Sequence, residues 1–150
     1  MRVLFGIIAA ALLLLGALNG ILAPVADTCT QNSPDSLVGG VFVIGFNLAG
    51  FALLSRGFRP VWIGLIAALP SLAAIKYTGF AIWFADGYWS HGMTACMAIT
   101  GYDSWELSGD EDFFVKLWVA ASLTFWAGLA YSLWCGYRTR SKDLDFDQAR

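Results

Sequence analysis

The sequence predicts an all-α integral membrane protein, folded as a bundle of four transmembrane helices with one longer outer loop. Of its 150 residues, 58% are hydrophobic and 13% are charged, whereas about 25% of residues are charged in soluble domains. Four apolar runs approach or exceed the length of about 20 residues that a helix needs to cross a bilayer. The two loops that join these runs on one side contain no lysine or arginine. We therefore expect one transmembrane domain over residues 1–142 and a frayed tail over 143–150.

The ends of the apolar runs carry helix start and stop signals. Pro24 ends the first run, Pro34 and Pro60 suit the first turns of the second and third helices, and Ser108 and Glu111 have the spacing of a capping box before the fourth. A cleaved signal peptide is the alternative for the first run, but this run is longer than the usual 7–15 residues and no small-x-small cleavage site follows it. The expected helices cover residues 3–23, 34–54, 60–84 and 109–136.

The distribution of charge predicts the orientation. By the positive-inside rule, lysine and arginine gather on the cytoplasmic side, and the outer loops over residues 24–36 and 85–112 lack both. Both termini should therefore be cytoplasmic, in a multi-pass protein of the bacterial inner membrane. The inner connection is only five residues long, so the second and third helices should form a tight antiparallel hairpin. The inner basic residues are Arg2, Arg56, Arg59, Arg138, Arg140 and Lys142.

Two of the three cysteines should share the outer side. Cys29 lies in the first outer loop and Cys96 in the second, where an oxidising compartment permits a disulfide. Such a bridge would close a loop of roughly 65 residues, which is worth about 4 kcal/mol on the chain-entropy model. Two free thiols remain the alternative. Cys135, at the inner end of the fourth helix, is expected to be an unpaired small apolar residue.

The stretch "HGMTACM" gathers possible ligands for a soft metal. His91, Met93, Cys96 and Met97 would suit Cu(I). Their spacing matches no fixed metal motif, and Cys96 could not ligate a metal while bonded to Cys29. We therefore expect neither a metal nor another cofactor, and periplasmic-side copper or redox handling through this loop remains a further alternative.

Lys76 is the main anomaly within the membrane. Side chains on a helix lean toward its N-terminus. Lys76 therefore leans toward the cytoplasmic side of the membrane, whereas Lys116 leans toward the outer side and can pair with Asp112. A charge at depth costs about 2.5 kcal/mol or more. Lys76 should therefore meet the bundle interior, a partner chain or a lipid headgroup, or reach the outer interface. The polar residues that could contact it from within helices are Asn19, Asn47, Ser122, Thr124 and Tyr131.

Small residues predict close helix packing, either within the chain or between chains. Gly16 and Gly20 form a G-x-x-x-G pair, and Gly45 and Gly50 lack side chains that would keep a neighbouring helix away from the second helix. Pro70 should kink the third helix and free backbone groups near the depth of Lys76.

These features favour a non-catalytic protein. The sequence shows no close pair of cysteines and no catalytic cluster, and its partners should be the lipid bilayer and a membrane protein or a second copy, with no nucleic acid. We expect an accessory, assembly or interaction subunit of a larger inner-membrane complex. The alternative is an oligomeric small transporter or channel that uses Lys76.

Overall fold

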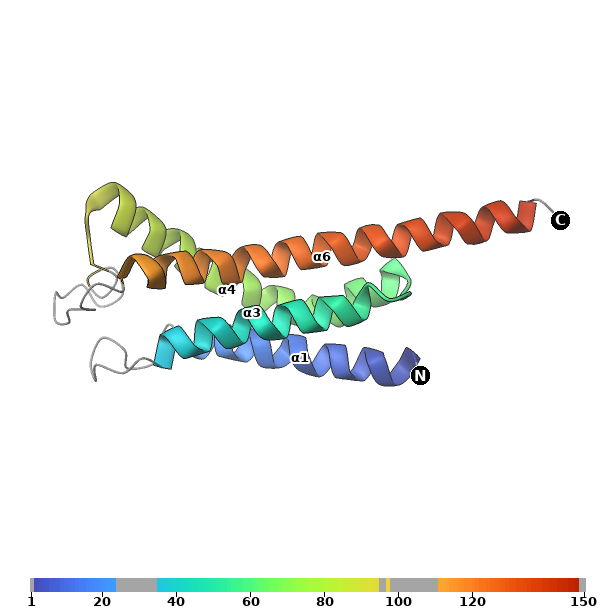
Figure 1. Ribbon diagram of the computed structural model, residues 1–150, viewed down its shortest axis with the longest axis horizontal. Coiled ribbons are helices and arrows are strands. Elements are labelled where there is room, and N and C mark those ends of the chain that lie inside the picture. The colour runs from blue at the N-terminus through green and yellow to red at the C-terminus, as the bar shows by residue number, and fades with distance from the viewer. Residues whose placement is uncertain (1, 24–34, 95–96, 98–110, 149–150) are drawn as a thin grey trace.

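The protein is all-helical over the residues that the structure, a computed structural model, describes: 2–23, 35–94, 97 and 111–148. Within them, each of the four helices is long and apolar enough to span a membrane (Figure 1), which confirms the all-helical architecture expected for these residues. The helices are α1 (Arg2–Leu22), α3 (Asp35–Leu54), α4 (Pro60–His91) and α6 (Glu111–Gln148).

The bundle is a four-sided arrangement in which α1 packs against α3 and α4, and α6 packs against the same two helices. α3 and α4 therefore lie diagonally across the core, although only residues 55–59 join them. The tight hairpin expected from this short connection is not formed. The small residues of α3 explain the difference, because Gly50 faces Leu13 of α1 and Gly40 faces Leu117 of α6, so the close approaches of α3 are made to these two helices.

Two helices extend beyond their apolar runs. α4 continues past the expected end at residue 84 to His91, where Gly92 adopts a left-handed φ of 62° and the backbone N–H of Met93 donates to the carbonyl of Gly87 at 2.9 Å. α6 continues past 136 to Gln148 and thus includes residues expected in the frayed tail. After Gly136 the sequence contains neither glycine nor proline, so nothing in it stops the helix at the end of the apolar run.

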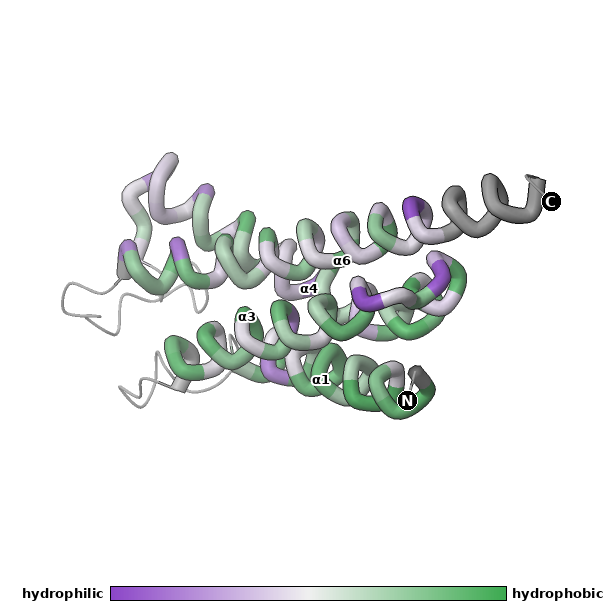
Figure 2. The backbone as a smooth tube through the Cα atoms, turned by 45° about the vertical axis from the view of Figure 1, so that its right-hand side comes forward, coloured by the Kyte–Doolittle hydropathy of each residue, from purple (hydrophilic) through white to green (hydrophobic). Residues whose placement is uncertain are grey.

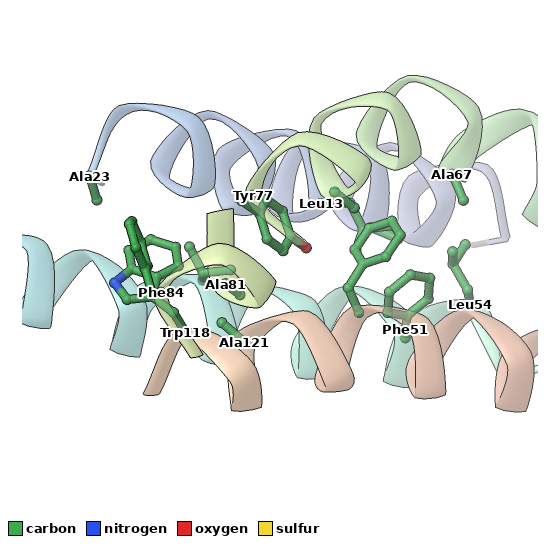
Figure 3. Close-up of a cluster of buried hydrophobic side chains, with 14 of the residues drawn as sticks. Leu13, Ala23, Phe51, Leu54, Ala67, Tyr77, Ala81, Phe84, Trp118 and Ala121 are labelled. Carbon is green, nitrogen blue, oxygen red and sulfur yellow. The ribbon is translucent and has the colours of Figure 1, made fainter. Parts of the chain in front are cut away.

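The largest side chains of the core are aromatic. Tyr77 from α4 meets Phe125 from α6 edge-on, with 6.3 Å between ring centroids, and Phe51 from α3 meets the same ring at 5.2 Å. Leu13 of α1 and Trp118 of α6 are also fully buried. Figure 3 shows these side chains converging from all four helices, so the described helices share one core.

The outward faces of the helices are also apolar. Leu18 on α1, Val41 on α3, Leu72 on α4 and Leu123 on α6 are each more than half exposed. Figure 2 shows hydrophobic residues along most of each helix and much of the hydrophilic character at helix ends and at the α3–α4 connection. Hydrocarbon or protein, rather than water, is the natural surrounding for such faces.

Candidate functional site

Lys76 lies on the outward face of α4. Its side chain is exposed, whereas Ala73, Ala74 and Tyr77 on the adjoining part of the helix are buried. Lys76 makes no hydrogen bond or ion pair with any residue that the structure describes. Lys76 therefore does not face the bundle interior, which was one of the surroundings expected for it.

An exposed row of residues runs along α4 on both sides of Lys76. We call it the α4 stripe. Its positions are separated by 4, 3, 4, 3 and 4 residues, which is the seven-residue repeat of helices that pair side by side. It has leucines on the inner side of Lys76, and a glycine and a tryptophan on the outer side. The stripe comprises Leu65, Leu69, Leu72, Lys76, Gly79 and Trp83, all exposed.

The opposite face of α4 fixes the direction of the stripe. Ile63, Ala67, Ala74, Tyr77 and Ala81 from this face are at most 2% exposed and belong to the common core. Because α4 uses this face to pack against α1 and α6, the stripe has no partner within the described part of the chain. The repeat is visible in the sequence, but only the packing shows that it faces outward.

The polar residues considered as neighbours of Lys76 bond elsewhere. The Asn19 side chain donates to the carbonyl of Leu15 at 2.9 Å, within α1. Asn47 is buried in the core, where its Nδ2 lies 3.5 Å both from the hydroxyl of Tyr77 and from the carbonyl of Ala121. Its Oδ1 is buried with no hydrogen-bond partner among the described residues. Asn47 is thus a polar residue of the core.

Ser122 and Thr124 also bond locally, each donating to a carbonyl of α6. Tyr131 is exposed on the same helix. Lys116, the second lysine within an apolar run, bonds to Asp112 one turn earlier, as its position predicts. None of these hydrogen bonds involves Lys76.

The residues of the possible metal site are only partly described. His91 places Nδ1 3.2 Å from the carbonyl of Asp86 and 3.7 Å from a carboxylate oxygen of the same residue. Met93 and Met97 are 37% and 40% exposed. Among the described residues, no three His, Cys, Asp or Glu side chains gather in a way that could hold a metal ion. Both of these contacts of His91 lie within α4.

Cys29 and Cys96 lie outside the described residues, so their disulfide stays a prediction, and the capping box at Ser108 falls outside as well. Cys135 is a half-buried free thiol on α6.

The glycines of the packing prediction differ in their surroundings. A Cβ at Gly16 would lie 3.1 Å from Oδ1 of Asn47, one at Gly20 would lie 2.4 Å from the Tyr77 ring, and one at Gly50 would lie 2.8 Å from Leu13. These three glycines allow α1 to approach its neighbours closely. Gly45 is exposed, and a Cβ added there would meet no atom within 4 Å, so it takes part in no contact between the described helices.

Two grooves flank α4, and the sequence gives no direct signal for either. One of about 660 Å³ lies between the first turns of α1 and α4, beside the α3–α4 connection. The other, of about 490 Å³, lies between the outer halves of α4 and α6, where Nε1 of Trp126 donates to the hydroxyl of Thr78 at 3.0 Å.

The fold and the α4 stripe define the class to which the described part belongs: all-helical proteins with four candidate membrane spans and an unpartnered helix face. No protein-family model, curated protein or solved structure matches the chain.

Proposed function

We propose that this protein is a non-catalytic, multi-pass subunit of the bacterial inner membrane that docks onto another membrane protein through the α4 stripe. It would serve as an accessory, assembly or interaction subunit of a larger complex. The observation that carries the proposal is Lys76, which forms no hydrogen bond or ion pair with the described residues and lies in the middle of an otherwise apolar stripe that faces away from the bundle.

The membrane placement rests on the outward faces of the helices. All four helices are long and apolar enough to cross a bilayer. In each of them, less than half of the most apolar 18-residue segment is buried inside the structure. The unburied apolar surface would be unstable in water and stable in hydrocarbon.

The orientation rests on the basic residues. Figure 1 shows the N-terminus, the α3–α4 connection and the C-terminus at one end of the bundle. Arg56 and Arg59 in the connection and Arg138 near the inner end of α6 are exposed there. The positive-inside rule then supports a cytoplasmic position for this end.

The position of Lys76 supports a protein partner rather than lipid alone. The apolar run from Val61 to Phe84 has its midpoint near residue 72, so Lys76 lies about 5 Å from the centre of the span at a rise of about 1.5 Å per residue. A lysine at such depth costs about 2.5–3.5 kcal/mol on insertion scales. A partner helix with a carboxylate or carbonyl oxygen opposite Lys76 would remove much of this cost.

Photocrosslinking tests the docking face. A photoreactive amino acid at Leu72 in the stripe is compared with one at Leu48, which is 55% exposed on α3 across the bundle. Membranes of the native host are irradiated, and adducts are identified by mass spectrometry. We expect a discrete adduct with a different membrane protein from position 72 only. No adduct, or equal adducts from both positions, would contradict the proposal.

The charge is tested with two lysine variants. Lys76→Met should reduce co-purification of the crosslinked partner in mild detergent by tenfold or more, because a buried charge pair is lost. The control is Lys116→Met, which removes an exposed lysine paired within its own helix and should leave the yield of partner unchanged. Equal yields of the co-purified partner from both variants would show that Lys76 is not part of the interface.

The same observation supports a second candidate, an oligomeric small transporter or channel. Since Lys76 faces outward, copies that meet through their α4 stripes would bring several lysines around a shared path, which would favour anions. In this case the adduct from position 72 would be a second copy of the chain. Lys76→Met should then abolish anion flux into proteoliposomes without changing the oligomer, and unchanged flux would exclude this candidate.

A further inference from the structure

The larger groove combines an apolar wall with a cationic end. Val3, Ile7 and Ala10 recur at helical spacing on α1, and Trp62 and Ile66 recur on α4, so each helix contributes one apolar edge. The α3–α4 connection closes the inner end of the groove with Gly57, Phe58 and Arg59. Among the lining residues that the structure describes, Arg59 is the only one with a charged side chain.

The shape of the groove depends on two glycines. A Cβ at Gly6 would lie 3.2 Å from the ring of Phe58 and 3.8 Å from Ile66, so glycine keeps the floor of the groove low. Gly57 has a φ of 100°, which side chains other than glycine rarely adopt. This turn places the ring of Phe58 next to Gly6 of α1 and Arg59 in the lining of the groove.

The cationic end lacks a counter-ion in the described part of the chain. Arg56 and Arg59 are both exposed and form no ion pair with any residue described there. Arg59 is also the N-cap residue of α4, and no side chain caps this helix end. The positive end of the helix dipole therefore adds to the attraction that the guanidinium exerts on an anion.

We propose that this groove binds one anionic phospholipid, with the phosphate at Arg59 and an acyl chain along the apolar edges formed by α1 and α4. The phosphate charge complements Arg59, and arginine can form paired hydrogen bonds with phosphate oxygens. Basic pockets between helices at the cytoplasmic side suit anionic headgroups, and the volume of about 660 Å³ is in the range of ligand sites. The inference rests on the membrane placement proposed above but needs no protein partner.

Native mass spectrometry of the purified full chain in mild detergent tests the site. Phosphatidylglycerol and phosphatidylcholine with identical acyl chains are titrated separately, and we expect the anionic lipid to bind at least fivefold more tightly. Arg59→Gln should weaken phosphatidylglycerol binding about fivefold, the effect of one basic residue near an anionic headgroup. Arg59→Lys should retain most of the binding, because it keeps the charge.

Two further variants make the result specific. Arg138→Gln removes another exposed inner arginine, which lies over the ring of Trp134 with 5.3 Å between Cζ and the ring centroid, and should not change binding. Ala10→Phe places a ring in the groove and should weaken the binding of both lipids. Far-UV circular dichroism of each variant verifies that the helices are retained, and a misfolded variant is replaced by the milder Ala10→Val.

Several outcomes would overturn the assignment. Equal affinity for the two lipids would show that the charge of the headgroup is not recognised. Equal losses of affinity with Arg59→Gln and Arg138→Gln would show diffuse electrostatic attraction without a site. Competition by millimolar inorganic phosphate would show that free phosphate is the ligand. Because the test uses the isolated chain, its failure leaves the crosslinking from Leu72 unaffected, and failure of that crosslinking leaves the lipid site intact.

Discussion

Gly20→Ala tests the contact between α1 and α4 most directly. A Cβ at Gly20 would lie 2.4 Å from Cδ1 and 2.9 Å from Cε1 of Tyr77, whereas carbon atoms pack favourably at about 3.5–4.0 Å. The ring or the helix must therefore move by about 1 Å. Tyr77 has little room to move, because it is fully buried, bonded to Asn47 and set edge-on against Phe125.

Gly45→Ala is the matched control on α3. No atom lies within 4 Å of the added methyl group, so the substitution should be neutral or should stabilise the helix by up to about 1 kcal/mol. Overpacking at Gly20 should destabilise by about 1–3 kcal/mol. We therefore expect the two variants to differ by about 2 kcal/mol in their free energy of unfolding.

The measurement is an unfolding titration with sodium dodecyl sulfate in mixed micelles, followed by far-UV circular dichroism. Equal midpoints for Gly20→Ala and the unmodified protein would refute the close approach of α1 to Tyr77. A loss of stability in Gly45→Ala as large as that in Gly20→Ala would show that the effect comes from the glycine backbone and not from the contact.

Three further predictions concern other contacts. Ser132→Ala removes the 3.1 Å bond from a fully buried hydroxyl to the carbonyl of Phe51 and should lower stability by about 0.6 kcal/mol in the same titration. Asn47→Ala should lower the stability by about 1–2 kcal/mol, because the core loses volume and both hydrogen bonds of the amide. Unchanged stability would show that the amide is not buried in the core. If Cys29 and Cys96 form a disulfide, alkylation in denaturant without reductant should label Cys135 alone, and three labelled thiols would exclude the bridge.

The sequence was a good guide to where α4 begins, because Pro60 starts this helix as expected, with Arg59 as the N-cap residue. It was a poorer guide to where α4 ends. Hydropathy marks the part of a helix that suits hydrocarbon, whereas α4 ends only where Gly92 can adopt a left-handed conformation. Gly92 is present in the sequence, but the drop in hydropathy after Phe84 indicated an earlier end of the helix.

The candidate site could be predicted only in part. A lysine within an apolar run is apparent from sequence, and so is its cost. Its direction is not, because the pattern of α4 is apolar on every side, and Lys76 could have faced Asn47 as easily as the exterior. Packing decides between these positions: Tyr77, the next residue, fills the core and directs Lys76 outward. The groove at Arg59 depends on contacts among three segments and has no local sequence signal.

The diagonal placement of α3 and α4 has a consequence for how the protein is made. Two helices joined by five residues would ordinarily form a unit as soon as both are synthesised. Here each packs mainly on α1 and α6, and the contact between α3 and α4 includes the pair of side chains Asn47 and Tyr77. In the membrane placement proposed above, part of α3 and α4 stays uncovered until the last helix is synthesised. A nascent chain released before α6 would therefore expose the Phe51 and Tyr77 surfaces, which insertion chaperones and proteases could recognise.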